Sequence, residues 1–139
     1  MTMSRPELTE EEAEFVRWAR VARMATVGAD GGLHNVPISP VLVDGRILIA
    51  TDTKSKKVRN LESEPRTSLV FDEYSEMWDL LHGVVIEGTV RIIPEGAEFS
   101  SARAKLYEKY RQYEIDSPIE QGGSVILEVM PERILSWGF

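Results

Sequence analysis

The chain has 139 residues, of which 42% are hydrophobic, and a formal net charge of −7 at pH 7. That length fits a single domain, residues 1–139, with a core of its own, and the apolar fraction argues against disorder. The acidic balance disfavours a nucleic-acid binder, because such proteins present a basic face.

Residue types narrow the chemistry further. No apolar run approaches the roughly 18 residues of a membrane span, and the N-terminus lacks the apolar segment of a signal peptide. The chain has no cysteine, which excludes disulfides and thiolate metal ligands and favours a cytoplasmic protein. The two histidines, His34 and His82, have no paired spacing, so we expect no metal site. We interpret His34 as an exposed strand residue.

The first predicted element is a helix that begins after Thr9. Thr9 and Glu12 have the spacing of a capping box, in which each side chain bonds the backbone N–H of the other residue. Apolar residues recur behind them at helical spacing, so this helix is expected to bury one face. The face comprises Phe15, Trp18, Ala19 and Ala22. We therefore predict Trp18 in the core rather than in a ligand site.

A strand hairpin is predicted to follow the helix. A strand from Met24 turns at residues 30–32 into a second strand, residues 33–43. Pro37 and Pro40 cannot donate to a sheet ladder. The second strand is therefore an edge strand, or a bulged strand whose backbone groups are free for another partner.

The central segment of the chain is predicted to run from strand to helix to strand. A hairpin turn at residues 44–45 leads into a β-branched strand, residues 47–50, which ends before Thr51. Ser55 is the predicted N-cap of a helix, and Pro65 stops that helix before the next apolar strand.

This arrangement is typical of an anion site. Thr51 and Ser55 bring hydroxyl groups, and Lys54, Lys56 and Lys57 bring positive charge, to the unpaired N–H groups at the start of a helix. Lysine at this position opposes the helix dipole, an unfavourable interaction that a bound anion removes. The alternative interpretation is that these lysines are solvated surface residues.

The second half of the chain is predicted to contain three strands and one long helix. A strand at residues 83–93 has a bulge or bend at Gly88, and strands at residues 124–130 and 133–137 are separated by a turn at residues 131–132. The apolar face of the helix comprises Phe99, Ala102, Leu106, Tyr110 and Tyr113. Six or seven strands in hairpin order with three helices predict a closed or nearly closed antiparallel barrel with peripheral helices.

Two motifs of the central segment resemble a known superfamily: T-x-x-x-S-K-K from Thr51 and E-x-x-P-R-x-S-L-x-F from Glu62. With A-T-V-x-x-D-G from Ala25 and with Pro37, they resemble the pyridoxamine 5'-phosphate-oxidase-like flavin-binding split barrels over residues 23–137. The resemblance implies a mainly β (α+β) fold, a six- to seven-stranded antiparallel split β-barrel with peripheral helices.

A narrower likeness is to the branch of that superfamily that uses the deazaflavin coenzyme F420. It lies in R-V-A-R from Arg20, D-x-Y-x-x-x-W from Asp72, K-Y-x-x-Y from Lys109, and E-R from Glu132 followed by Trp137. This branch implies an F420-dependent oxidoreductase that transfers a hydride to or from a small organic substrate.

The resemblance also implies roles for particular residues. Thr51, Ser55, Lys56 and Lys57 become phosphate ligands, and a homodimer interface completes the pocket. The ring edge is lined by the backbone of Val36, Pro37, Ile38 and Ser39. Trp78 or Trp137 caps the ring across the dimer, with core packing as the alternative. From the position of the charges we further expect the acidic F420 tail to meet Lys54 and Arg59, which flank the phosphate site, and Arg20 and Arg23, which approach it from the first helix.

One departure from the family pattern bears on the cofactor. Classical pyridoxamine phosphate oxidases place an arginine where this chain has Val36, and they end in an arginine-bearing substrate motif that is missing here. We therefore do not expect oxidation of pyridoxamine phosphate, and we favour F420 over FMN.

No nucleophile–base pair is visible in the sequence, so we expect no protein residue with a strong acid–base role. A hydride-transferring cofactor suits such a chain, because it brings its own reactive carbon. Alternatives are an FMN-dependent reductase or oxidase of the same fold, a carrier protein that binds the cofactor without turnover, and an anion-binding barrel with no redox role.

Overall fold

Seven strands and four α-helices make up residues 5–139, the part of the chain that the structure, a computed structural model, describes. The strands are β1 (Ala22–Val27), β2 (Leu33–Ile38), β3 (Val41–Val43), β4 (Arg46–Asp52), β5 (Arg66–Glu73), β6 (His82–Ile93) and β7 (Ser124–Trp137). The helices are α1 (Glu10–Trp18), α2 (Lys56–Ser63), α3 (Ala97–Lys109) and α4 (Gln112–Asp116), with a short 3-10 turn, η1 (Trp78–Leu80).

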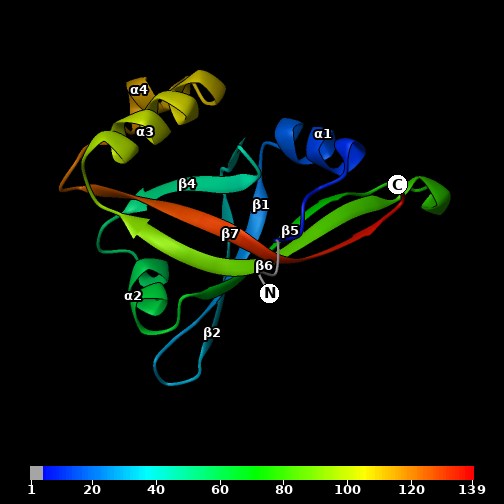
Figure 1. The fold of residues 1–139 in the computed structure, drawn as a ribbon, viewed down its shortest axis with the longest axis horizontal. Helices are drawn as coiled ribbons and strands as arrows, with labels where there is room; N and C mark the ends of the chain where they lie inside the picture. The colour runs from blue at the N-terminus through cyan, green and yellow to red at the C-terminus, as the bar shows by residue number, and fades with distance from the viewer. Residues whose placement is uncertain (1–4) are drawn as a thin grey trace.

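The strands form one antiparallel sheet in the order β2-β1-β5-β6-β7-β4-β3. The sheet curls around its own core, and the helices lie at its periphery, with α2 well separated from α1, α3 and α4 (Figure 1). The predicted fold class, a mainly β antiparallel split barrel with peripheral helices, is confirmed. No helix among residues 5–139 is long and apolar enough to cross a membrane.

The longest strands, β6 and β7, pair along the whole molecule and contain the predicted bulge. Their register shifts between Glu87 and Gly88. A Cβ at Gly88 would lie 2.3 Å from the backbone oxygen of Met130, so the close approach of the strands requires glycine. The predicted turn at residues 131–132 is wrong. Pro131 pairs with Gly88, and β7 continues because the bulge absorbs one extra residue.

The edge position predicted for the proline-containing strand is confirmed, because β2 forms one edge of the sheet. The prediction of one strand over residues 33–43 is wrong, since the chain leaves the sheet at Ser39 and Pro40 and re-enters it as β3 at the other edge. The turn at residues 44–45 is confirmed by the pairing of β3 with β4 and by positive φ angles of 50° and 76° at its two residues.

Two apolar clusters fill the molecule. The first lies within the curl of the sheet and includes Met24, Ile47, Leu69, Phe71, Val84 and Ile86. The second lies between the sheet and α3, and it includes the predicted helix face Phe99, Ala102, Leu106 and Tyr110. Tyr110 is 2% exposed, so its predicted packing role is confirmed.

Helix α1 begins as predicted, but its apolar face differs. Thr9 and Glu12 form the capping box. Trp18 is 71% exposed, so its prediction as a core residue is wrong. Val16 takes the inward position instead, and the indole Nε1 of Trp18 donates to Glu14 Oε1 at 2.7 Å on the solvent side.

Candidate cofactor site

The end of β4 and the start of α2 are joined by side-chain hydroxyl groups. Ser55 is the N-cap of α2, as predicted, and its Oγ accepts a hydrogen bond from the backbone N–H of Val58 at 3.4 Å. Thr51 Oγ1 donates to the same Ser55 Oγ at 3.3 Å. The two predicted hydroxyl ligands, Thr51 and Ser55, are therefore neighbours.

The turn between them is held by hydrogen bonds that backbone N–H groups donate. The N–H of Lys54 donates to Asp52 Oδ1 at 2.7 Å, and the N–H of Ser55 donates to the carbonyl of Asp52 at 3.1 Å. The N–H of Thr53 donates to the carbonyl of Gly123 at 3.0 Å. With the Val58 N–H taken by the N-cap, the amides of Lys56 and Lys57 have no partner within the helix. They are the groups that an anion would meet.

The structure separates the lysines into two kinds. Lys54 and Lys56 are exposed, whereas Lys57 is half-buried. Burial lowers the pKa of Lys57, and the Asp52 carboxylate partly opposes that shift. Lys57 takes part in no ion pair among the described residues. A partly desolvated ammonium group that takes part in no ion pair fits a phosphate, whose negative charge would stabilise the protonated form.

Helix α2 is fixed to the sheet by a buried polar contact that sequence reasoning missed. Asn60 is 6% exposed, and its Nδ2 donates to Thr26 Oγ1 on β1 at 3.0 Å. In the sequence, Asn60 lies between the apolar residues Val58 and Leu61 of a short helix. That position was the available signal that its side chain is buried. The contact holds the helix, and with it the candidate anion site, against β1.

The predicted ring-edge residues lie on and just after the edge strand β2. Ile38 is buried and Val36 packs against the core, so both side chains serve the fold. Pro37 points outward and is exposed. Because β2 pairs only with β1, alternate backbone groups of β2 face away from the sheet and are free to meet a ligand.

Tyr113 connects the end of β2 with the end of β4. Burial raises the pKa of the Tyr113 hydroxyl, and a hydrogen bond with Ser39 opposes the shift. The same tyrosine lines a cavity of about 260 Å³ beside Thr51 and Asp52. Tyr113 packs against the second apolar cluster as predicted, and its ring also lines this cavity.

The exposure predicted for His34 is wrong. His34 is half-buried on β2, and its Nδ1 is the one side-chain polar atom among the described residues that is buried without a hydrogen-bond partner. It lies opposite Thr26, the residue that binds Asn60 of α2. Within residues 5–139, no group of three or more acidic, histidine or cysteine side chains is placed to hold a metal ion.

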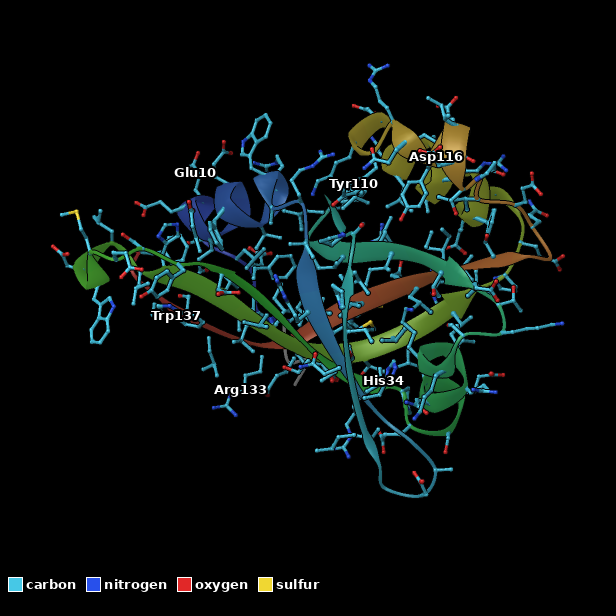
Figure 2. The ribbon with its side chains drawn as sticks, turned by 180° about the vertical axis from the view of Figure 1, so that it is seen from behind. Glu10, His34, Tyr110, Asp116, Arg133 and Trp137 are labelled. Carbon is cyan, nitrogen blue, oxygen red and sulfur yellow. The ribbon has the colours of Figure 1, made fainter. Side chains whose placement is uncertain are left out.

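Trp78 and Trp137, the candidates for capping the ring, lie far from the anion site within one chain. Figure 2 shows Trp137 near one end of the molecule, and α2 lies toward the other end in Figure 1. About 40 Å of extended strand separates Trp137 from Val125, the β-sheet partner of Thr51. Trp78 and Trp137 are 73% and 43% exposed, which excludes the core-packing alternative for both. One chain alone does not bring them to Ser55 and Lys57.

Comparison with known proteins gives one family match and several relatives. Residues 8–138 match the family described as pyridoxamine 5'-phosphate oxidase. The chain is 28% identical over 135 residues to the 5a,11a-dehydrotetracycline/5a,11a-dehydrooxytetracycline reductase of Streptomyces rimosus. The aligned residues cover 94% of this chain and 82% of that protein.

Solved structures agree on the fold. A conserved hypothetical protein of Mycobacterium tuberculosis is 28% identical, with a TM-score of 0.81 over 98% of this chain and 89% of that chain. A haem-binding protein from Mycobacterium smegmatis is 21% identical, with a TM-score of 0.82 over 98% of this chain and 56% of that longer chain. A protein named F420 reductase is 19% identical, with a TM-score of 0.74 over 92% of this chain and 98% of that chain.

Proposed function

Because the chain belongs to the pyridoxamine 5'-phosphate oxidase family, we propose that it binds coenzyme F420 and transfers a hydride between that deazaflavin and a small organic substrate. The observation that carries the proposal is the start of α2, where unpaired amides, two hydroxyl groups and the half-buried Lys57 converge. The names of two similar proteins, a tetracycline-type reductase and an F420 reductase, support an oxidoreductase.

The protein's part in this reaction is to bind the cofactor and orient its ring. The amides of Lys56 and Lys57, the hydroxyls of Thr51 and Ser55, and the ammonium of Lys57 would hold the cofactor phosphate. The backbone of β2 at Val36–Ser39 would meet the ring edge. When bound, the ring supplies the carbon that carries the hydride. We assign no acid–base role to a protein side chain.

We further propose that the working unit is a homodimer. On the outer face of the sheet, Val70, Val85 and Leu135 form a row across β5, β6 and β7. Trp137 follows Leu135 on the same face of β7 and is exposed, and Met77, Trp78 and Leu80 are exposed on the segment between β5 and β6. A monomer that exposes so many large apolar groups is unusual, and a partner would cover them. The partner subunit's Trp78 or Trp137 could then reach the ring that one chain leaves uncapped.

The choice of F420 over FMN rests on Val36 and on charge. Val36 packs against the core. The family resemblance places an arginine at this position in the FMN-dependent oxidases. Lys54, Lys56 and Arg59 are exposed around the phosphate site and suit the acidic F420 tail. Arg20 fits that tail role less well within one chain, because it bonds the end of α3, and Arg23 lies on β1 and not on the first helix. An FMN-dependent reductase remains the alternative, since both cofactors carry the phosphate.

Binding and turnover assays test the proposal. Purified protein is titrated with F420 and FMN, and the reduced complex is then mixed with conjugated and quinone-like acceptors. Binding with turnover supports a reductase, and binding without turnover against the whole panel supports a carrier. If neither cofactor binds while inorganic phosphate does, the chain is an anion-binding barrel. A strictly monomeric mass in sedimentation at micromolar concentration would contradict the dimer.

A further inference from the structure

The ends of α1 and α3 meet and bond each other through basic side chains. Lys109, the last residue of α3, donates from its Nζ to the carbonyl of Ala19 at 2.6 Å, where α1 ends. Arg20 Nη1 donates to the carbonyl of Lys109 at 3.0 Å. Each cation therefore satisfies a carbonyl at the end of the other helix, and positive charge is favourable there. This reciprocal contact explains why two cations lie close together without a carboxylate.

The same junction also holds the end of β2. Lys109 Nζ makes a second bond, to the carbonyl of Pro40 at 2.7 Å. The hydroxyl of Tyr110 lies 2.7 Å from that carbonyl and 3.0 Å from the carbonyl of Arg20. Both lone pairs of the Pro40 carbonyl thus have donors. Burial raises the pKa of Tyr110, so its hydroxyl stays protonated and remains a donor at neutral pH.

These bonds act on Pro40, at the end of the edge strand β2. Pro40 immediately follows the segment Val36–Ser39, and β2 is held by a neighbouring strand on one side only. Pro37 has no N–H to add to that ladder. An edge strand that is paired on one side only gains from a second constraint that keeps the end of its backbone in place. Tyr110, which Figure 2 shows beneath α3, and Lys109 supply that constraint.

We propose that Lys109 and Tyr110 are positioning residues, which fix the Ser39–Pro40 end of β2 so that the backbone of Val36–Ser39 lies in place for the cofactor ring. This inference rests on the proposed function. It assigns a purpose to the K-Y pair that the phosphate site does not use. Neither side chain touches the cofactor in this account; both act through Pro40.

The test removes the hydroxyl group or the ammonium group without removing bulk. Tyr110→Phe and Lys109→Met are the test variants. Tyr107→Phe is the matched control, because Tyr107 lies on the same helix and its hydroxyl bonds Ile119 instead of β2. Lys105→Met, an exposed position on α3, is the control for the lysine.

The first measurement needs no cofactor. Amide hydrogen exchange is followed at Val36, Ile38 and Ser39 in the unliganded chain. Loss of about one hydrogen bond's worth of constraint should speed exchange there about fivefold in Tyr110→Phe and Lys109→Met. Exchange at these amides should stay at the wild-type rate in Tyr107→Phe and Lys105→Met. Equal acceleration across the whole sheet, or in the controls as well, would show a general loss of stability and overturn the proposal.

The second measurement compares ligands. In Tyr110→Phe, affinity for F420 or FMN should fall about tenfold, whereas affinity for inorganic phosphate should change less than about twofold. The absorption spectrum of the bound ring should shift in the same variant. Wild-type affinity and spectrum in both test variants would overturn the positioning role alone. If the wild-type chain binds phosphate but neither cofactor, the proposed function fails and this inference fails with it.

Discussion

Gly83 lies directly under the indole of Trp137, because the two residues pair across β6 and β7. A Cβ at position 83 would lie 2.3 Å from Cζ2 of that ring. The glycine therefore fixes where the exposed tryptophan rests, and Trp137 belongs to the apolar surface that we propose a partner subunit covers.

Replacing this glycine should displace the tryptophan. We expect Gly83→Ala to change the fluorescence of Trp137 and to weaken dimerisation, measured by sedimentation over a range of concentrations. Gly123→Ala is the control, since a Cβ there meets only the Glu120 carbonyl, at 3.9 Å. An unchanged dimer constant with a clearly shifted fluorescence would remove Trp137 from the interface.

The lysines at α2 should contribute unequally to binding. Because Lys57 is half-buried and Lys56 is exposed, Lys57→Ala should weaken cofactor binding by about 1.5–3 kcal/mol, and Lys56→Ala by less. The free energy of unfolding should hardly move in Lys56→Ala, because an exposed lysine contributes little to it. Calorimetric titration of both variants checks this. Equal, small losses would return these residues to the solvated-surface interpretation.

Lys109 should make stability depend on pH in a defined window. Burial and the nearby Arg20 charge lower the pKa of Lys109 from its ordinary 10.5 to about 8. Between these values the unfolded chain binds more protons than the folded chain, so the contribution of Lys109 to the free energy of unfolding rises as pH rises. The difference in that free energy between wild type and Lys109→Met should therefore increase from about pH 8 to 10.5. A flat difference over that window would contradict the shift.

A buried carboxylate on β7 should stabilise the folded chain. Glu128 is 2% exposed and bonds both Arg46 and Arg91, the latter at 3.1 Å from Arg91 Nε. Glu128→Gln keeps the shape and removes the charge, so it should lower the free energy of unfolding by about 1.5–3 kcal/mol. Glu98→Gln, which alters an exposed contact with Arg91, should have no measurable effect. Denaturant melts of both variants provide the comparison, and equal effects would refute the distinction.

The sequence predicted local features well where one residue type dictates the geometry. Thr9 and Ser55 cap helices as expected, the 44–45 turn has the positive φ angles that such a turn needs, and Gly88 marks the bulge. The caps and the turn depend on neighbours in the chain, whereas the bulge depends on the close approach of β7 and was predictable because only glycine allows that approach. The exposure of Trp18 could not be predicted in this way, because the helix could have presented either of two apolar stripes to the sheet.

The candidate site was predicted only in part for a similar reason. The motif located the phosphate-binding groups, but the difference between Lys56 and Lys57 depends on how α2 packs against β1. The contacts of Lys109 and Tyr110 with Pro40 join residues 69 and 70 positions apart in the chain. No local pattern reports such contacts. Whether the tryptophans reach the site depends on a second chain.

The measurement that tests the central claim most directly is a competitive titration of F420 and FMN at low and moderate salt. We predict tighter binding of F420, and a steeper loss of its affinity with salt, because its acidic tail would meet the exposed Lys54, Lys56 and Arg59. Lys57→Ala should weaken both cofactors, since both carry the phosphate. Tighter binding of FMN at both salt concentrations would contradict the choice of cofactor, and no binding of either would contradict the site itself.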